Sequence, residues 1–206
     1  MRSILCFGDS NTWGYDAASE ERLPWDVRWP GVLQRLLGPD VRIVEEGLNG
    51  RSTMFDRPEQ PSRNGNEVLP MLLETHAPLD DVVVALGIND LFVPGITPRW
   101  SARGIGSILL TIEQSASGPA GAVPRVLVVA PPPITTLPEH WAMDAPGATA
   151  ASHDLPAAFR YVCDPLGVPV LDLTGVIEPD PLDGEHFTAE GHAAIAAAVA
   201  AALVPA

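Results

Sequence analysis

Lysine is absent from this sequence, so all 12 of its basic residues are arginines, and 26 acidic residues outnumber them. The formal net charge is −14 at pH 7, and the arginines form no basic run. Binding to nucleic acid or to an anionic membrane surface depends on clustered positive charge. We therefore expect no nucleic-acid partner and no membrane partner, and the same imbalance argues against highly anionic substrates.

Cysteine and long apolar runs are also scarce. The two cysteines, Cys6 and Cys163, are too few for a disulfide framework, and both are expected to be small buried hydrophobes. No apolar run approaches the roughly 18 residues that a membrane span needs; the alanine-rich stretch 193–204 is the nearest candidate. The first strand is expected to begin near Ser3, which leaves no room for a secretory signal before it. We therefore expect a cytoplasmic protein.

The composition is that of a folded chain, with 46% apolar and 18% charged residues. A length of 206 residues allows one sizeable core and is too short for two comfortable domains. We find no internal repeat and no linker between domains. The sequence therefore predicts a single domain over residues 1–206.

Five short runs rich in Val, Ile and Leu are typical of buried parallel strands, and they cover residues 3–7, 41–45, 81–86, 125–130 and 169–173. Helical patterns cover residues 29–37, 66–76, 98–116 and 150–166, and a last helix follows Thr188, a good N-cap. This alternation predicts an α/β fold, a three-layer α/β/α sandwich. With right-handed crossovers, we expect a flavodoxin-like, five-stranded parallel sheet with the strand order 2-1-3-4-5.

Ser10 follows the first strand directly, in the turn Gly8-Asp9-Ser10. In open α/β folds ligands bind at the carboxyl edge of the sheet, so Ser10 lies where a nucleophile would be useful. A serine needs a base, and the candidate is His186, near the other end of the chain. Asp183 precedes His186 by one turn, close enough to hold the imidazole while its other nitrogen reaches Ser10.

Two further stretches end at the same edge, Asn49-Gly50 after the second strand and Asn89 after the third. Acyl transfer needs fixed hydrogen-bond donors for the oxyanion that develops in the reaction. The side-chain amide of Asn89 and the backbone N–H groups of Ser10 and Gly50 can supply them. Glycine at position 50 also lets the backbone approach the substrate closely. We predict an oxyanion hole formed by Ser10, Gly50 and Asn89.

Two long irregular stretches, 16–30 and 131–147, also follow strands at this edge and are expected to form functional rims or contact surfaces. Trp13 and Trp141 are the candidates for an apolar wall around the acyl or alcohol group of a substrate. The chain has no lid domain, so the pocket should be shallow and suited to small acyl groups. The tryptophans of these loops also favour a homo-oligomer.

Each of these residues has a simpler interpretation when it is taken alone. Gly-Asp-Ser is a common turn, Asn89 can be a turn residue at a strand end, and Asp183 to His186 can be a turn followed by a cap. The rival function is a non-catalytic, flavodoxin-like module whose loop after the first strand binds a phosphate or a flavin. That loop has few of the glycines that a phosphate cradle uses, and the Asp183/His186 pair would then have no evident purpose.

Taken together, the stretches around Ser10, Gly50, Asn89 and His186 resemble the four blocks of the SGNH (GDSL-type) hydrolases, which are named for Ser, Gly, Asn and His. The blocks match in order and spacing, and the resemblance spans essentially the whole chain. Three stretches, ILCFGDS (4–10), VEEGL (44–48) and VLVVAPPP (126–133), resemble the bacterial arylesterase/acyltransferase and carbohydrate-acetylesterase branch. Asn11 departs from the pattern, since it stands where a leucine would follow the serine.

The resemblance implies a Ser10–His186–Asp183 triad, an oxyanion hole of Ser10, Gly50 and Asn89, and no cofactor. His192 lies near His186, but their spacing is not that of a zinc-binding helix, so we expect no metal. The implied protein is a serine esterase that hydrolyses or transfers short acyl groups through an acyl-enzyme. Its expected partners are small ester substrates, such as aryl esters or acetylated sugars.

Overall fold

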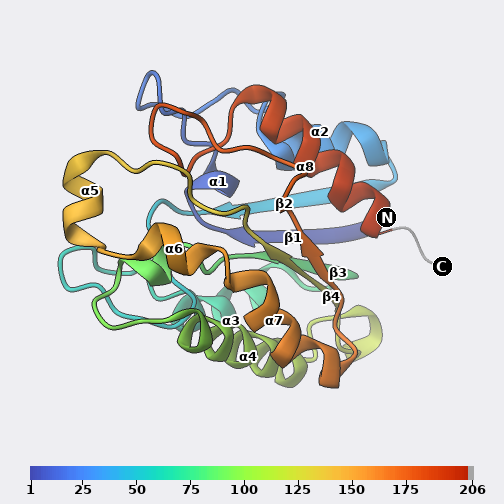
Figure 1. Ribbon diagram of the computed structural model, residues 1–206. Helices are drawn as coiled ribbons and strands as arrows, with labels where there is room; N and C mark the ends of the chain where they lie inside the picture. The colour runs from blue at the N-terminus through green and yellow to red at the C-terminus, as the bar shows by residue number, and fades with distance from the viewer. Residues whose placement is uncertain (204–206) are drawn as a thin grey trace.

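The computed structural model describes residues 1–203 and contains one five-stranded parallel sheet with the order β2-β1-β3-β4-β5 (Figure 1). The strands are β1 (Arg2–Gly8), β2 (Val41–Gly47), β3 (Asp81–Ala85), β4 (Arg125–Ala130) and β5 (Val170–Asp172). Both the predicted strand positions and the predicted strand order are confirmed. The reversal of order between β1 and β3 creates a crevice at the carboxyl ends of these two strands, where ligands bind in folds of this kind.

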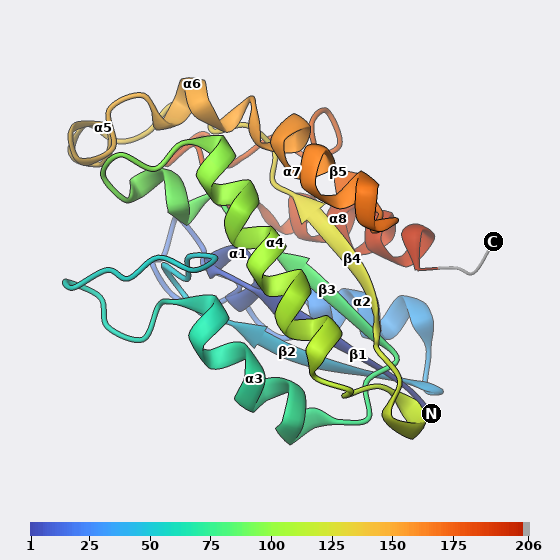
Figure 2. The ribbon, with the colours of Figure 1, turned by 90° about the horizontal axis from the view of Figure 1, so that it is seen from below.

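Helices cover both faces of the sheet, as the predicted sandwich requires (Figure 2). One face carries α2 (Trp29–Leu37) and α8 (Ala189–Ala202), and the other carries α3 (Gly65–His76), α4 (Pro98–Gln114) and α7 (Leu155–Cys163). Three short helices lie beyond the carboxyl ends of the strands, namely α1 (Ser10–Trp13), α5 (Glu139–Asp144) and α6 (Ala148–Ser152). None of the helices among residues 1–203 combines the length and the apolar character needed to cross a bilayer.

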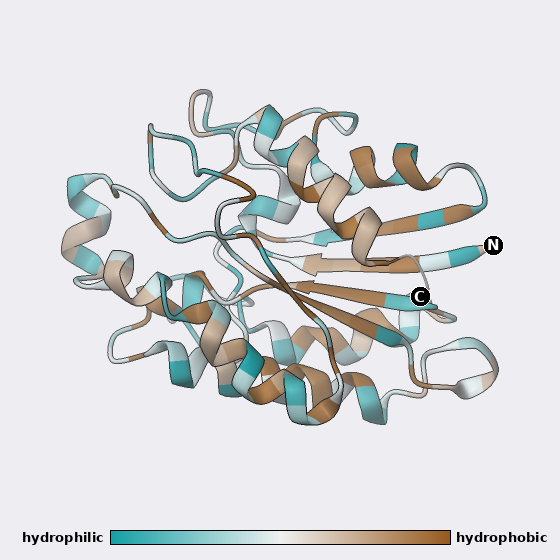
Figure 3. Ribbon diagram, turned by 45° about the vertical axis from the view of Figure 1, so that its right-hand side comes forward, coloured by the Kyte–Doolittle hydropathy of each residue, from teal (hydrophilic) through white to brown (hydrophobic). Residues whose placement is uncertain are grey.

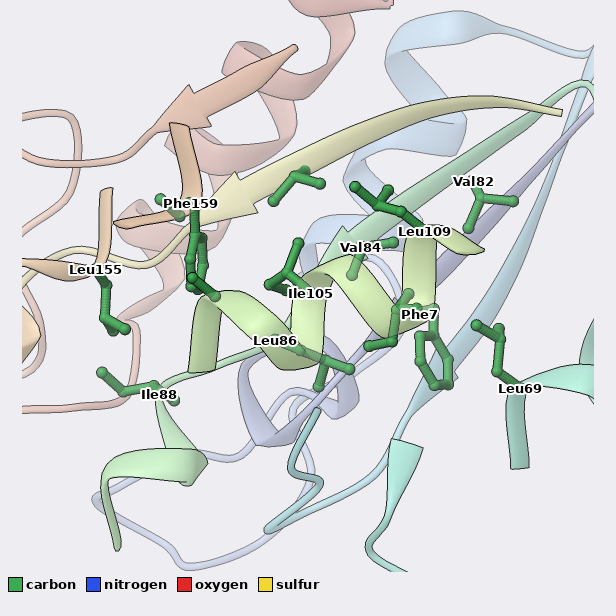
Figure 4. Close-up of a cluster of buried hydrophobic side chains, with 14 of the residues drawn as sticks. Phe7, Leu69, Val82, Val84, Leu86, Ile88, Ile105, Leu109, Leu155 and Phe159 are labelled. Atoms are coloured by element: carbon green, nitrogen blue, oxygen red, sulfur yellow. The ribbon is translucent and has the colours of Figure 1, made fainter. Parts of the chain in front are cut away.

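The core lies on both faces of the sheet, because successive side chains along β1 point to opposite faces. Leu5 and Phe7 pack into the cluster under α3, α4 and α7 (Figure 4), whereas Ile4 and Cys6 pack into the cluster under α2 and α8. All four side chains are fully buried. Burying one Leu, Ile or Phe contributes about 1.5–3 kcal/mol. This double burial explains why the inner strands are largely apolar, as the brown colour along much of their length shows (Figure 3).

The late helix differs from its prediction. A single helix over 150–166 was expected, but the chain forms α6, then α7, then a 3-10 turn over Asp164–Leu166. Pro156 explains the break between α6 and α7, because proline cannot donate a backbone hydrogen bond within a continuing helix and is accepted in the first turn of a new one. The predicted N-cap of the last helix is confirmed, since the hydroxyl of Thr188 accepts a hydrogen bond from the N–H of Gly191 at 3.2 Å.

Two ion pairs hold the first long loop, between α1 and α2, against β2. Glu45 of β2 accepts hydrogen bonds from Arg28 at 2.8 Å and from Arg22 at 2.6 Å. The side chains of Arg28 and Glu45 are both about nine-tenths buried, so their pairing satisfies charges that water does not reach well. The loop that carries Tyr15 is therefore fixed beside the end of β1.

Candidate active site

The turn that carries Ser10 is built for close packing. β1 ends at Gly8, and α1 begins at Ser10, where Asp9 caps the helix by accepting the N–H of Asn11 at 3.0 Å. A Cβ atom at Gly8 would lie 2.0 Å from the hydroxyl oxygen of Thr12, so a glycine is needed there. Asp9 is thus an anchor of the turn, and Ser10 lies at the carboxyl edge of the sheet.

Asp183 and His186 come from the loop between β5 and α8. Gly184 between them has a φ of +73°, and a Cβ atom there would lie 2.5 Å from the carbonyl oxygen of Thr136. The N–H of Thr135 donates to the carbonyl of Gly184 at 2.9 Å. The loop after β4 therefore holds this turn in place, and glycine is the residue that both the backbone angle and the space demand.

Ser10, His186 and Asp183 form one chain of hydrogen bonds. The hydroxyl oxygen of Ser10 lies 2.8 Å from Nε2 of His186, and Nδ1 of His186 lies 2.7 Å from Oδ2 of Asp183. The other carboxylate oxygen of Asp183 accepts the backbone N–H groups of Glu185 and His186, each at 3.0 Å. All three side chains are buried. Residues separated by most of the chain thus meet as the sequence predicts.

The charges around His186 favour its protonated form. Burial alone would lower the pKa of His186, but the hydrogen bond with Asp183 and the charges of Glu185 and Asp183 outweigh burial and raise it. Burial acts to raise the pKa of Asp183, and its hydrogen bond and charge interaction with His186 hold that pKa below its ordinary value. An imidazolium formed by proton transfer from Ser10 would therefore be stabilised where it forms.

The predicted oxyanion donors lie beside Ser10. Gly50, with a φ of +72°, and Asn89 line the same cavity as Ser10. The side-chain nitrogen of Asn89 is buried and has no hydrogen-bond partner among the described residues. An unpaired buried donor is costly, which makes this nitrogen available for a substrate atom. The geometry brings together all of the predicted donors.

Asp90 fixes the segment that carries Asn89. Its carboxylate accepts the N–H and the hydroxyl of Thr53, both at 2.8 Å, and the hydroxyl of Ser101 at 2.6 Å. Burial raises the pKa of Asp90 to about 6, although these hydrogen bonds act to lower it. Asp90 is therefore a structural anchor, and it links the loops after β2 and β3.

Arg51 joins the ends of β1 and β2 behind Gly50. Its guanidinium donates to the carbonyl oxygen of Gly8 at 2.8 Å and to that of Glu46, and it lies 4.6 Å from the ring of Phe7. Burial lowers the pKa of Arg51 to about 10, so the group stays charged near neutral pH. These contacts hold the strand end that leads to Ser10 in a fixed place relative to the Gly50 turn.

A cavity of about 450 Å³ opens above Ser10. Its lining combines aromatic and polar side chains; the lining residues are Ser10, Tyr15, Asn49, Gly50, Arg57, Glu59, Gln60, Asn89, Phe92, Trp141, Asp144, Glu185 and His186. Trp141 reaches the cavity, as expected, and its ring meets the ring of His186 edge-on at 6.1 Å. Phe92 in turn meets Trp141 edge-on at 6.4 Å.

Trp13 does not line this cavity, which corrects its expected place in the substrate wall. The guanidinium of Arg22 lies 5.0 Å from the centre of the Trp13 ring, and Arg22 is itself bound to Glu45 of β2. The ring is therefore part of the contact between the first long loop and β2. Sequence position alone, three residues after Ser10, could not reveal this competing cation–π contact.

Tyr15 and Glu185 line the cavity beside His186, although neither was a predicted site residue. The ring of Tyr15 packs on the imidazole of His186 with ring centroids 4.4 Å apart, and the carboxyl of Glu185 lines the cavity next to His186. Burial and the charge of Asp183 raise the pKa of Glu185, while the charges of His186 and Arg57 act to lower it. A signal for both was their position beside Ser10 and His186 in the sequence, although nothing there fixed the direction of their side chains.

A larger cavity of about 660 Å³ lies at the opposite edge of the sheet, among the amino ends of β3 and β4, α4 and the end of α8. Its lining is largely aliphatic and includes neither serine nor histidine, so it offers no serine–histidine pair. Among residues 1–203, no group of three or more His, Cys, Asp or Glu side chains is placed to hold a metal ion.

The arrangement at Ser10 meets the requirements of acyl transfer by a serine. A hydroxyl lies within hydrogen-bond distance of an imidazole, a carboxylate orients that imidazole, and a free amide donor faces the same space. No step of such a reaction needs a cofactor.

Comparisons with known proteins show the family of this chain. The model of the GDSL-like lipase/acylhydrolase family matches residues 6–194. The solved aryl esterase of M. smegmatis is 37% identical over 98% of each chain, with a TM-score of 0.92. A carbohydrate acetylesterase from Sinorhizobium meliloti is 36% identical over 99% of this chain and 100% of its own, also with a TM-score of 0.92.

A more distant structure shares the fold alone. It is a member of the lipolytic G-D-S-L family from Veillonella parvula, 17% identical over 98% of each chain, with a TM-score of 0.69. Among the curated proteins compared by sequence, none matches this chain.

Proposed function

The chain belongs to the GDSL-like lipase/acylhydrolase family and is a carboxylic ester hydrolase, and from this premise we propose that Ser10, His186 and Asp183 are its catalytic triad. The observation that carries the proposal is the continuous hydrogen-bonded chain from the Ser10 hydroxyl through the imidazole to the Asp183 carboxylate. Ser10 is the nucleophile, His186 is the general base and acid, and Asp183 orients and stabilises the imidazolium.

The reaction runs in two halves through an acyl-enzyme. His186 takes the proton of the Ser10 hydroxyl at Nε2 as the oxygen attacks the ester carbonyl carbon, and the carbonyl oxygen becomes an oxyanion. Collapse of this tetrahedral intermediate breaks the bond to the alcohol, which leaves with the proton from His186. A water molecule then attacks the acyl-serine with His186 again as base, and the acid is released.

The oxyanion is stabilised by the side-chain amide of Asn89 and by the backbone N–H groups of Ser10 and Gly50. The absence of any partner for the Asn89 nitrogen among the described residues supports this role. A preorganised donor gains strength from burial, and each one typically contributes a factor of about 10²–10³ in rate.

The substrates that we propose are small esters with short acyl groups, such as aryl esters or acetylated sugars. The resemblance to an aryl esterase and to a carbohydrate acetylesterase supports this choice. The cavity supports it as well, because its lining combines the apolar ring of Trp141 with the polar side chains of Asn49 and Gln60. An alcohol that takes the place of water in the second half would give acyl transfer.

The decisive experiment measures turnover of p-nitrophenyl acetate by the wild type and by Ser10→Ala and His186→Ala. We expect each variant to lose at least about 10³-fold in kcat, because triad members act as a unit. Ser19→Ala and His153→Ala are matched controls on exposed residues and should keep wild-type turnover. Unchanged turnover in Ser10→Ala, with folding intact by circular dichroism, would reject the assignment.

The rival phosphate- or flavin-binding module finds no support in the related structures, which are esterases.

We also propose that residues 1–206 form a single domain and that the protein is a cytoplasmic homo-oligomer. Cys6 and Cys163 are both free and buried, which suits a reducing compartment. Exposed apolar side chains, among them Trp25 and Trp100, support contact between subunits. Light scattering coupled to gel filtration would give the subunit number, and a monomer at micromolar concentration would contradict the proposal.

A further inference from the structure

Glu185 places an unpaired carboxylate in the catalytic cavity. Its backbone is fixed on both sides, since its N–H donates to Asp183 at 3.0 Å and its carbonyl accepts the side-chain nitrogen of Asn11 at 3.4 Å. Its side chain lines the cavity, and the residue is 7% exposed. No hydrogen bond from residues 1–203 reaches the carboxylate. A buried carboxylate without donors is costly, so a group from outside the chain is the natural partner.

The charges that line the cavity are unbalanced. Its carboxylates are those of Glu59, Asp144 and Glu185, and Arg57 is the guanidinium among the lining residues. Arg57 is already paired with Glu59 at 3.0 Å. Asp144 at the rim and Glu185 in the interior therefore have no ion-pair partner among residues 1–203, and the interior one lies where water screens it least.

Aromatic rings face the same space. Tyr15, Phe92 and Trp141 line the cavity, and both Tyr15 and Trp141 also contact the imidazole of His186. The π-face of such a ring attracts a cation, and the attraction grows when the cation is removed from water. Aromatic faces together with an unpaired carboxylate suit a compact, weakly hydrated positive charge better than a neutral or anionic group.

We propose that this cavity selects esters whose alcohol part carries a positive charge, such as the acetyl ester of a quaternary ammonium alcohol. The inference rests on the proposed esterase function, because it concerns the same cavity. The reaction sets the orientation of the bound ester. His186 delivers the proton to the leaving alcohol, so the alcohol part of the ester lies next to His186. Glu185 is the neighbour of His186 in the chain and lines the same cavity.

The charge state of Glu185 depends on the charges around it. Burial raises its pKa, and the negative charge of Asp183 acts in the same direction, whereas the positive charges of His186 and Arg57 act against them. A bound cation adds a further positive charge and so favours the ionised carboxylate. Asp9 and Tyr15 also lie near this turn, and burial raises the pKa of each of them.

The test compares two esters of the same shape, acetylcholine and 3,3-dimethylbutyl acetate, in which a carbon atom replaces the charged nitrogen. In the wild type, kcat/KM for the cationic ester should exceed that for the neutral ester by about tenfold or more. In Glu185→Gln, which keeps the shape and removes the charge, the ratio should fall toward one. Glu74→Gln is the matched control, an exposed residue on α3 that carries the same change, and it should keep the wild-type ratio.

Several outcomes overturn the proposal. A wild-type ratio of one or less does so, even if Glu185→Gln does not fold. An unchanged ratio in Glu185→Gln, with both esters slowed alike, would show that Glu185 acts on His186 and not on the substrate.

A second measurement needs no variant: tetramethylammonium should inhibit hydrolysis of the neutral ester competitively, and equal concentrations of sodium chloride or tert-butanol should not. Failure to turn over either ester and p-nitrophenyl acetate as well would instead reject the esterase function itself.

Discussion

The ring of Tyr15 packs on the imidazole of His186, with ring centroids 4.4 Å apart and planes inclined by 42°. Trp141 meets the same imidazole edge-on. The two nitrogens of the imidazole are hydrogen-bonded to Ser10 and to Asp183. The base is therefore constrained on a face and at both nitrogens. Holding a catalytic group in its reactive orientation avoids an entropic cost during the reaction, and a misplacement of 1 Å can cost about 100-fold in rate.

The packing of Tyr15 can be separated from its hydroxyl by two substitutions. Tyr15→Phe keeps the ring and should change kcat for p-nitrophenyl acetate by no more than about twofold. Tyr15→Ala removes the ring and should lower kcat by about tenfold or more, because the imidazole gains freedom to turn away from Ser10. Steady-state kinetics measure both effects, and an equal loss in the two variants would show that the hydroxyl and not the ring is the important group.

Activity should rise with pH through the pKa of His186, because the neutral imidazole accepts the Ser10 proton. That pKa lies above 6.5, its ordinary value, since Asp183 and Glu185 outweigh the opposite effect of burial. In Asp183→Asn the hydrogen bond to a charge is lost and burial dominates. The acidic limb of kcat/KM should then move to lower pH, although the maximal rate falls by about 10⁴-fold. A profile measured from about pH 5 to pH 9 tests this, and an unmoved limb would contradict it.

Asn89 should act on the transition state more than on substrate binding. Asn89→Ala removes the unpartnered amide nitrogen and should lower kcat by about 10²–10³-fold with little change in KM. Asn66→Ala is a suitable control, because the Asn66 amide bonds to Ser107 at 3.0 Å between α3 and α4, away from the cavity. That variant should lose stability and keep kcat. A rise in KM with constant kcat in Asn89→Ala would assign Asn89 to ground-state binding instead.

His192 should make the fold sensitive to acid. It is fully buried, its Nδ1 accepts the N–H of Trp29 at 3.3 Å, and burial lowers its pKa to about 4. The unfolded chain, with an ordinary histidine pKa of 6.5, binds this proton more tightly than the folded chain does. The contribution to stability is therefore complete above pH 6.5 and is lost as the pH falls to about 4, by up to about 3 kcal/mol.

Comparison with His192→Asn isolates this effect, since an asparagine oxygen can still accept the Trp29 N–H. Asp9 and Asp90 act in the opposite direction, because burial raises the pKa of these carboxyls to about 7 and about 6. They are present in both proteins and cancel in the difference. Urea unfolding at about pH 7 and about pH 4.5 should show the wild type losing more stability than the variant. Equal losses would mean that His192 does not titrate in this range.

The sequence was most informative where a residue's role depends on its place along a strand. A side chain directly after a buried parallel strand must lie at the carboxyl edge, so Ser10 and Asn89 could be placed before the structure was known. The strand order followed in the same way from the alternation of elements and the handedness of crossovers. His186 could be placed because the turn that begins at Asp183 directly precedes the last helix.

Side-chain direction within loops was beyond such reasoning. Trp13 and Tyr15 are two residues apart, yet one packs under Arg22 and the other on His186. Which of them reaches the cavity is decided by the tie between Arg22 and Glu45 of β2, a contact between segments far apart in the sequence. Glu185 illustrates the same limit, because nothing local distinguishes a solvated glutamate from one that lines a cavity.

Gly184 and Gly175 offer a paired test of how the base is held. Both have a φ of +73°, so alanine at either position meets similar backbone strain, about 1 kcal/mol. At Gly175 a Cβ atom has nothing within 4 Å, whereas at Gly184 it would lie 2.5 Å from the carbonyl oxygen of Thr136. Gly175→Ala should therefore lose a little stability and keep its kcat. Gly184→Ala must move the turn that carries His186, so kcat should fall by about 100-fold or more. Equal activity in the two variants would show that the turn tolerates displacement and that the Thr136 contact does not position the base.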